Sequence, residues 1–142
     1  MSSQNLTNYK RYHPLFHFFL LPLCLIGLVL AVIALVKSPA EGRMVHILLA
    51  LAFFLLFNIA GLARIYAMKV QDRVIRQEEN FRHYLLAGKP LDRHLRTGQI
   101  IALRFASDAE LVDLAARSVA ENLSPRQIKE SIKHWRGDHR RV

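Results

Sequence analysis

Two long apolar stretches constrain this chain more than any other feature of its sequence. Residues 15–36 and 44–63 contain no Asp, Glu, Lys or Arg, and the polar segment 37–43, with one Pro and one Gly, separates them. The hydrocarbon core of a bilayer is about 30 Å thick, and a helix needs roughly 20 apolar residues to cross it. Both stretches are long enough, so the sequence predicts a transmembrane hairpin of two helices.

A cleaved signal sequence is the alternative for the first stretch, because Ser38-Pro39-Ala40 loosely resembles a cleavage site. The apolar core of a signal sequence is only about 7–15 residues long, and this stretch is longer and follows a polar arm, residues 1–14. We therefore expect it to remain as a span. Cys24 is the only cysteine, so no disulfide forms within the chain, and we expect it to be a small packing residue.

The distribution of basic residues predicts the orientation of the hairpin. Lys10 and Arg11 precede the first span, and the second span is followed directly by a basic group, whereas the loop holds Glu41 between its two basic residues. Basic residues accumulate on the cytoplasmic side, so both termini are expected there. The group after the second span is Arg64, Lys69, Arg73 and Arg76.

The sequence after the second span predicts further helices, which makes the expected fold class all-α. The second span shows no break before residue 86, so its helix is expected to continue into the cytoplasm. Gly88, Pro90 and Gly98 then indicate a linker, and a small cap of short helices follows. The expected layout is a polar cytoplasmic arm at 1–14, the hairpin at 15–63, the helical extension at 64–86, the linker at 87–98 and the cap at 99–142.

Helix-start signals place the helices of the cap. Ser107 with Glu110, and Ser124 with Gln127, have the spacing of capping boxes, and Pro125 suits a first helical position. We predict helices near 108–121 and 125–136, after a short helix near 99–105. About 44 residues rarely fold alone, so the cap is expected to lean on the extension, on the membrane surface or on another copy. Its expected core is Ile101, Phe105, Leu111, Leu114, Ala115, Val119, Ile128, Ile132 and Trp135.

The extension carries an apolar stripe at helical spacing, interrupted by Gln77 and Glu78. A stripe this broken does not suit a long coiled coil. It suits a helix that packs against a small domain or a bundle, and the basic residues beside it lie where anionic headgroups can be contacted. The stripe is Ala67, Val70, Val74, Phe81 and Leu85.

Four blocks of the sequence resemble those of a family of small bacterial two-span inner-membrane proteins, a domain of unknown function. The blocks are HPLFHFFLLP, ARIYAMKVQDRVIR, LRFASDAEL and IKHWRGDHRRV. The resemblance covers nearly the whole chain and implies this architecture in a bacterial inner membrane. It implies no catalytic or ligand residue, and therefore leaves the function open.

Small residues form a stripe along the first span, where a second helix can approach closely. Antiparallel pairing places three aromatic rings of the second span near this stripe, and we favour packing within the hairpin over packing between protomers. The predicted seam is Cys24, Gly27, Ala31, Ala34, Phe53, Phe54 and Phe57. His17 and Asn58 fall at similar levels, and in spans without charged residues we favour a hydrogen bond between them over a step in an ion path.

No constellation in the sequence predicts an enzyme, a metal site or a cofactor. His13 and His17 are four residues apart, a spacing that metals can use. His46 is expected at the opposite end of the hairpin from His17, so these two histidines cannot hold a common haem. Phosphate-binding loops, zinc motifs and nucleophile motifs are absent from the sequence. We expect no catalytic residue, no metal ligand and no cofactor.

The last predicted helix carries Arg126, Lys129, Lys133 and Arg136 on one side. A solvated surface, anionic lipid and a protein partner all suit this group, whereas interspersed acids and the buried phase of Trp135 weigh against nucleic acid.

The leading hypothesis is a non-enzymatic, membrane-anchored interaction or scaffold module, or an accessory subunit of a membrane complex. Its partners would be the bilayer and another protein or a second copy. A homo-oligomeric two-span pore is the alternative, and an electrostatic lipid sensor is the weaker one.

Overall fold

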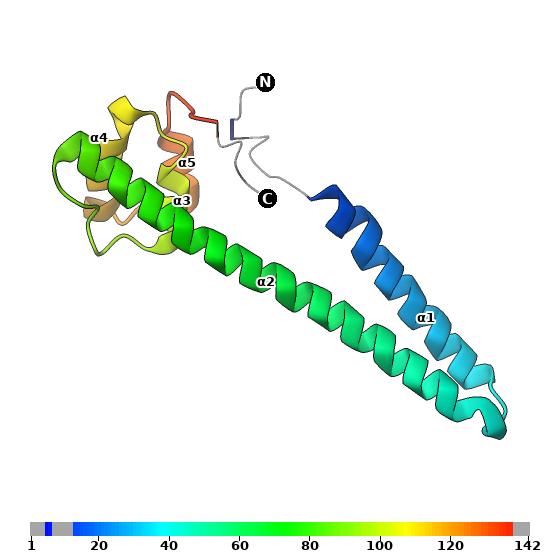
Figure 1. Ribbon diagram of the computed structural model, residues 1–142. Coiled ribbons are helices and arrows are strands. Elements are labelled where there is room, and N and C mark those ends of the chain that lie inside the picture. Colours follow the sequence, from blue (N-terminus) through cyan, green and yellow to red (C-terminus); the bar gives the residue numbers. More distant parts are fainter. Residues whose placement is uncertain (1–4, 7–12, 138–142) are drawn as a thin grey trace. The chain divides into compact units, whose positions relative to one another are not determined.

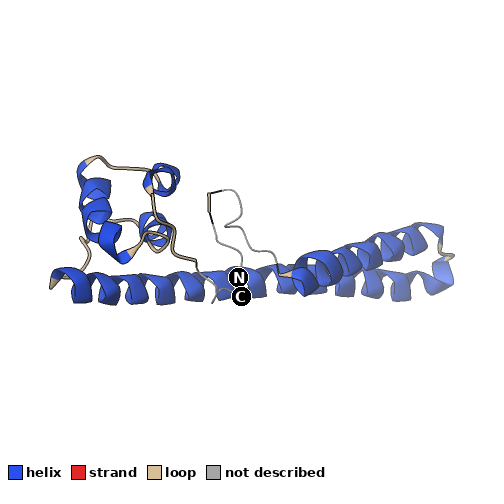
Figure 2. Cartoon of the chain, turned by 90° about the horizontal axis from the view of Figure 1, so that it is seen from above, coloured by secondary structure: helices blue, strands red, loops and turns tan. Residues whose placement is uncertain are grey.

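The computed structural model describes residues 5–6 and 13–137, and all of its regular elements are helices (Figures 1 and 2). The all-α prediction is therefore confirmed for the described residues. The chain divides between Met68 and Lys69, within one long helix, into two compact parts. The elements are the π-helix η1 (Leu15–Leu20), α1 (Leu21–Lys37), the 3-10 turn η2 (Ala40–Gly42), α2 (Arg43–Ala87), α3 (Thr97–Leu103), α4 (Asp108–Ala120) and α5 (Pro125–Ser131).

The first apolar stretch does not form one uniform α-helix. It begins with the six-residue π-helix η1, and the amide of Leu21 donates to the carbonyl of Phe16, five residues back. Pro22 follows at the start of α1 and has no amide hydrogen to continue an α-helical ladder. A widened turn before a proline relieves the clash of its ring with the preceding carbonyl, which accounts for the π geometry.

Two helices are long and apolar enough to cross a membrane by length and composition, Leu15–Lys37 and Ala40–Ala87. Almost no residue in either apolar window is buried within the protein. The buried exception in α1 is Ala31. These apolar surfaces are therefore open to whatever surrounds residues 13–68.

Helix α2 runs without interruption from Arg43 to Ala87, as the sequence predicted for the second span and its extension. It ends at Gly88, which has a left-handed backbone with φ of 68°. The amide of Gly88 donates to the carbonyl of Tyr84 at 2.9 Å. This bond satisfies one of the last free carbonyls of the helix, and glycine adopts the required conformation without strain.

Helices α3, α4 and α5 gather beside the carboxyl-terminal end of α2 and enclose a hydrophobic core (Figure 1). Phe105, Leu103, Leu111 and Ile128 are its largest fully buried apolar side chains. The segment 87–98 also contributes Leu91 and Leu95 to this core, so it is packed rather than a free linker. These additional apolar residues enlarge a core that would be small for residues 99–142 alone.

The start of α4 differs from the predicted capping pattern, and its end has a cap that was not predicted. Ser107 occupies the N-cap position, but its hydroxyl makes no hydrogen bond, so the expected capping box with Glu110 is wrong. At the other end, Asn122 has φ of 48° and Leu123 donates its amide to the Ser118 carbonyl at 3.1 Å. This is a Schellman motif, and it explains why α4 stops at Ala120.

Helix α5 is shorter than predicted, because it ends at Ser131 instead of residue 136. Ile132 adopts an extended backbone, and the chain then pairs with the turn between α3 and α4. The amide of Arg136 donates to the Phe105 carbonyl at 2.7 Å, and the amide of Ser107 donates to the His134 carbonyl at 3.1 Å. The predicted capping box of Ser124 and Gln127 is confirmed at the start of α5.

Candidate functional site: the attachment and outer face of α2

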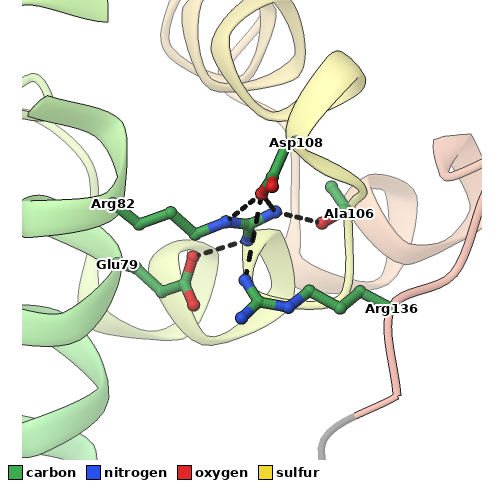
Figure 3. Close-up of polar contacts among 5 residues, drawn as sticks. All are labelled: Glu79, Arg82, Ala106, Asp108 and Arg136. Atoms are coloured by element: carbon green, nitrogen blue, oxygen red, sulfur yellow. Dashed lines mark hydrogen bonds and ion pairs between the residues drawn. The ribbon is translucent and has the colours of Figure 1, made fainter. Parts of the chain in front are cut away.

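Arg82, whose side chain is largely but not fully buried, joins α2 to the turn before α4 (Figure 3). Arg82 donates through Nε to Asp108 Oδ1 at 2.6 Å, through Nη1 to Glu79 Oε2 at 2.9 Å, and through Nη2 to the Ala106 carbonyl at 2.8 Å. A second guanidinium, from Arg136, lies 4.0 Å from the same Asp108 oxygen. Two acids and two bases thus balance in charge at this junction.

The burial of this junction decides which of its bonds matter. The side chains of Arg82 and Glu79 are 12% and 10% exposed, whereas that of Asp108 is 66% exposed. Charge-assisted bonds are stronger than neutral ones, and a buried charge that loses its partner is costly. The bond to the Ala106 carbonyl is therefore the main contact between α2 and the turn, the Arg82–Glu79 pair within α2 holds the guanidinium in place, and water screens the contribution of Asp108.

Two other side chains of α2 hold the chain that follows the helix. His83 is buried, and its Nδ1 donates to the Lys89 carbonyl at 2.8 Å. Asn80 accepts a bond from the Leu91 amide through Oδ1 at 2.9 Å. These bonds satisfy backbone groups that leave the helix and fix the path of the chain around Pro90.

The inner face of α2 is consequently mixed in polarity. Ile75, Glu79 and His83 recur every four residues, which places them on one side of the helix, and all three are buried. This face was not predicted from the sequence, because hydrophobic periodicity follows only apolar residues. The sequence feature that marks this face is the four-residue spacing of Ile75, Glu79 and His83.

The predicted apolar stripe of the extension lies on a different side of α2 from the inner face. Val70, Val74, Phe81 and Leu85 are 60%, 47%, 63% and 68% exposed. At 3.6 residues per turn the stripe is centred about 150° around the helix from the buried face. The expectation that this stripe packs against the cap is therefore wrong, because polar bonds from Arg82, His83 and Asn80 join α2 to the chain that follows it. We call the four exposed residues the outer face of α2.

Glu110 joins α4 to the chain after α5. Its carboxylate accepts from the Lys133 amide at 3.2 Å, from the His134 amide at 3.1 Å and from His134 Nδ1 at 2.7 Å. Partial burial raises the pKa of Glu110, but these hydrogen bonds outweigh it, and the net pKa is lowered. Glu110, which was predicted to form a capping box with Ser107, thus binds the chain at residues 133–134 instead.

The four basic residues predicted on one side of the last helix are divided between different surroundings. Arg126 pairs with Glu130 at 2.8 Å, which raises the pKa of the guanidinium. Lys129 lies 6.0 Å from the centre of the Phe105 ring. Lys133 and Arg136 follow the end of α5 and are not on the helix. The structure therefore does not form the continuous basic face expected on α5.

The small residues of α1 lie beside one of the predicted aromatic rings. A Cβ added to Gly27 would come within 2.4 Å of the Phe53 ring, so the two residues are in close contact. Phe53 and Phe57 are half-buried, whereas Phe54 is 52% exposed and faces away from this contact. Cys24 and Ala34 are half-buried and Ala31 is buried, consistent with one packed side of α1.

The polar residues of the apolar helices bond locally. Asn58 Nδ2 donates to the Phe54 carbonyl of its own helix at 2.7 Å, and His46 Nδ1 donates to the Gly42 carbonyl at 3.0 Å. His17 Nδ1 lies 3.1 Å from the His13 carbonyl. The hydrogen bond between His17 and Asn58 stays a prediction. Among the described residues, no group of three His, Cys, Asp or Glu side chains is placed to hold a metal ion.

These features define an all-α protein with two long apolar helices and a small packed helical part. The chain belongs to the family of unknown function DUF6526, whose model matches residues 1–142. The resemblance inferred from the four sequence blocks is thereby confirmed at the level of the family. No curated protein and no solved structure matches the chain.

Proposed function

We propose that this protein is a non-enzymatic interaction module anchored in the bacterial inner membrane, where it serves as an accessory subunit of a larger complex. Residues 15–36 and 44–63 would form a transmembrane hairpin, and both termini would be cytoplasmic. The exposure of nearly all residues in the two apolar windows supports this assignment, because the core helix of a soluble protein would be mostly buried. The close contact of Gly27 with Phe53 supports the pairing of the two spans.

The single observation that carries the interaction role is the outer face of α2. Val70, Val74, Phe81 and Leu85 are exposed on a helix whose opposite side already holds its own packing partner. Exposed apolar residues that gather on one side of a helix mark protein interaction sites when they lie outside a membrane, and here Gln77 and Glu78 separate them into two pairs. The spacing of the four residues fits a partner helix that lies along α2.

The engagement of the ionisable groups supports a non-enzymatic role. Glu79 and Asp108 bind Arg82, His83 binds a backbone carbonyl, and Glu110 accepts three bonds from the chain after α5. Groups used for catalysis must be able to reach a substrate atom, and these groups are committed to holding the fold.

Site-specific photo-crosslinking in native membranes tests this role. A photoreactive residue replaces Phe81 or Val74 in the full chain, and the matched control replaces Arg117, which is exposed on α4. We expect one partner protein to be crosslinked from positions 74 and 81 but not from 117. Adding Val70→Glu should abolish the crosslink from position 81, because a carboxylate is costly in an apolar contact.

Two results would contradict the accessory role. Equal labelling from all three positions would mean that the outer face has no particular affinity for a partner. Crosslinks between copies of this chain alone would replace the accessory role with self-association.

A further inference from the structure

A cleft of about 600 Å³ lies between α2 and the chain that follows it. Its walls include Arg73, Arg76 and Asn80 from α2 and Arg93 from the segment 87–98. All of these residues belong to the packed part of the chain from Lys69 onward. Leu91 and Ile100 are buried apolar residues that also line the cleft.

The fold holds the two walls of the cleft together. Asn80 accepts a bond from the Leu91 amide at 2.9 Å, and His83 binds the Lys89 carbonyl at 2.8 Å. These two bonds tie residues 89–91 to α2, only two residues before Arg93. The third arginine is thus brought to the same cleft as Arg73 and Arg76 by bonds that do not involve any of the three.

The cleft gathers positive charge that the described residues do not neutralise. Arg73, Arg76 and Arg93 form no ion pair within residues 13–137, in contrast to Arg82, Arg117 and Arg126. The one acid that lines the cleft, Asp92, accepts bonds from the amide and Nδ1 of His94, both at 2.8 Å. Both bonds lower the pKa of Asp92, and the bond from the His94 amide has the larger effect. The carboxyl group of Asp92 is therefore charged at neutral pH. Three guanidinium groups and one carboxylate leave a net charge of about +2.

We propose that this cleft binds a phosphate group, carried either by a lipid headgroup or by a small soluble phosphate. Guanidinium groups bind phosphate oxygens with paired, parallel N–H bonds, which a lysine cannot reproduce. Asn80 and Gln77 line the same cleft, and both carry side-chain amides that can donate further bonds. A phosphate would also relieve the repulsion of three like charges around one cleft.

The position of the arginines in the sequence makes a headgroup one natural source of the phosphate. Arg73 follows the predicted second span by ten residues on one uninterrupted helix. Basic residues close to a span are attracted to anionic lipid headgroups. The cleft differs from the predicted basic group on the last helix, because its three arginines come from two separate segments.

Protection of arginines from phenylglyoxal, read by mass spectrometry on the full chain, tests the proposal. In one arm the protein is in a neutral detergent with or without inorganic phosphate, at constant ionic strength. In the other arm it is in phosphatidylcholine nanodiscs with or without phosphatidylglycerol, and free phosphate is absent. We expect Arg73, Arg76 and Arg93 to be protected together, while the exposed Arg117 reacts equally in all conditions.

The two arms distinguish the sources. Protection by phosphatidylglycerol assigns the cleft to a lipid headgroup, and protection by inorganic phosphate alone assigns it to a soluble phosphate. No selective protection of the three arginines in either arm overturns the proposal.

A triple variant separates binding from folding. Replacing Arg73, Arg76 and Arg93 by Gln removes three mutually repelling charges, so thermal stability in phosphate-free neutral detergent should be unchanged or raised. The rise in melting temperature caused by phosphate should disappear, with a loss of affinity of more than about tenfold. The control R117Q/R126Q/K133Q removes equal charge elsewhere and should keep the phosphate response. A triple variant that retains this response would place phosphate binding outside the cleft, and one that is destabilised without phosphate would show the arginines to be structural; either result overturns the proposal.

Discussion

Removing the Arg82 guanidinium is expected to weaken the attachment of α2 to the helices that follow it. Arg82→Met keeps the aliphatic length of the side chain but leaves Glu79, which is only 10% exposed, without its partner. The Ala106 carbonyl also loses its donor. Asp108 is 66% exposed and is solvated by water, so its share is small. Together these losses amount to about 2–4 kcal/mol of unfolding free energy.

The single tryptophan reports this change directly. Trp135 packs on Phe105 in the core, with ring centres 5.3 Å apart, so its fluorescence follows the unfolding of α3 to α5. Denaturant titration of the full chain in neutral detergent gives the free energies of the variants. The control Arg117→Met breaks an exposed pair with Glu121 and should cost less than about 1 kcal/mol.

A double-mutant cycle provides the decisive comparison. Replacing both Arg82 and Glu79 by Met removes the pair without leaving a buried charge, so the double variant should recover part of the stability. The coupling between the two positions should be about 0.5–3 kcal/mol. An Arg82→Met variant as stable as the control, or additive effects of the two substitutions, would show that Arg82 and Glu79 do not form a stabilising buried pair.

Three further predictions concern other contacts. Gly27→Ala places a methyl group against the Phe53 ring and should destabilise the apolar helices by about 1–3 kcal/mol, and adding Phe53→Leu should restore part of the loss. Thermal unfolding followed by circular dichroism measures this change, and a Gly27→Ala variant of unchanged stability would contradict the contact. The pKa of Glu110 is lowered from 4.5, so its contribution to stability is complete above that pH and is lost as the pH falls through the lower, folded-state pKa. Glu110→Gln should flatten this acid limb in Trp135 fluorescence, and an unchanged pH profile would rule out the role of the carboxylate. Gly88→Ala forces a side chain into a left-handed conformation and should cost about 1 kcal/mol in the same denaturant assay, and no loss would count against the strained cap.

The apolar helices and the helix starts could be predicted from the sequence because their signals are local. Long runs of apolar residues define the two stretches, and Ser124 with Gln127 forms the expected capping box. The end of α5 could not be predicted, because Ile132 leaves the helix to pair with residues near Phe105, far away in the sequence. Such pairing competes with helix propensity and leaves no periodic signal.

The attachment of α2 escaped prediction for a different reason. Hydrophobic periodicity identifies the apolar side of a helix, and on the extension that side is the exposed one. The buried side relies on Glu79, Arg82 and His83, residue types that usually lie in water. Their partners are separated from them by between 3 and 26 residues in the sequence, so only the folded chain reveals that these charges are satisfied. The phosphate cleft was missed similarly, since Arg93 lies in a segment expected to be a linker.

The polar attachment of α2 also fixes the register in which the chain folds back on this helix. Moving the turn before α4 by one helical turn along α2 would place the Ala106 carbonyl and Asp108 opposite Glu78 or Leu86 instead of Arg82. One shift sets two oxygen acceptors against a carboxylate, and the other offers no donor at all. A purely apolar contact would tolerate both shifts at modest cost, whereas directional bonds to one guanidinium accept neither. The protein thus gives up some hydrophobic stabilisation on this side of α2 in exchange for a single alignment.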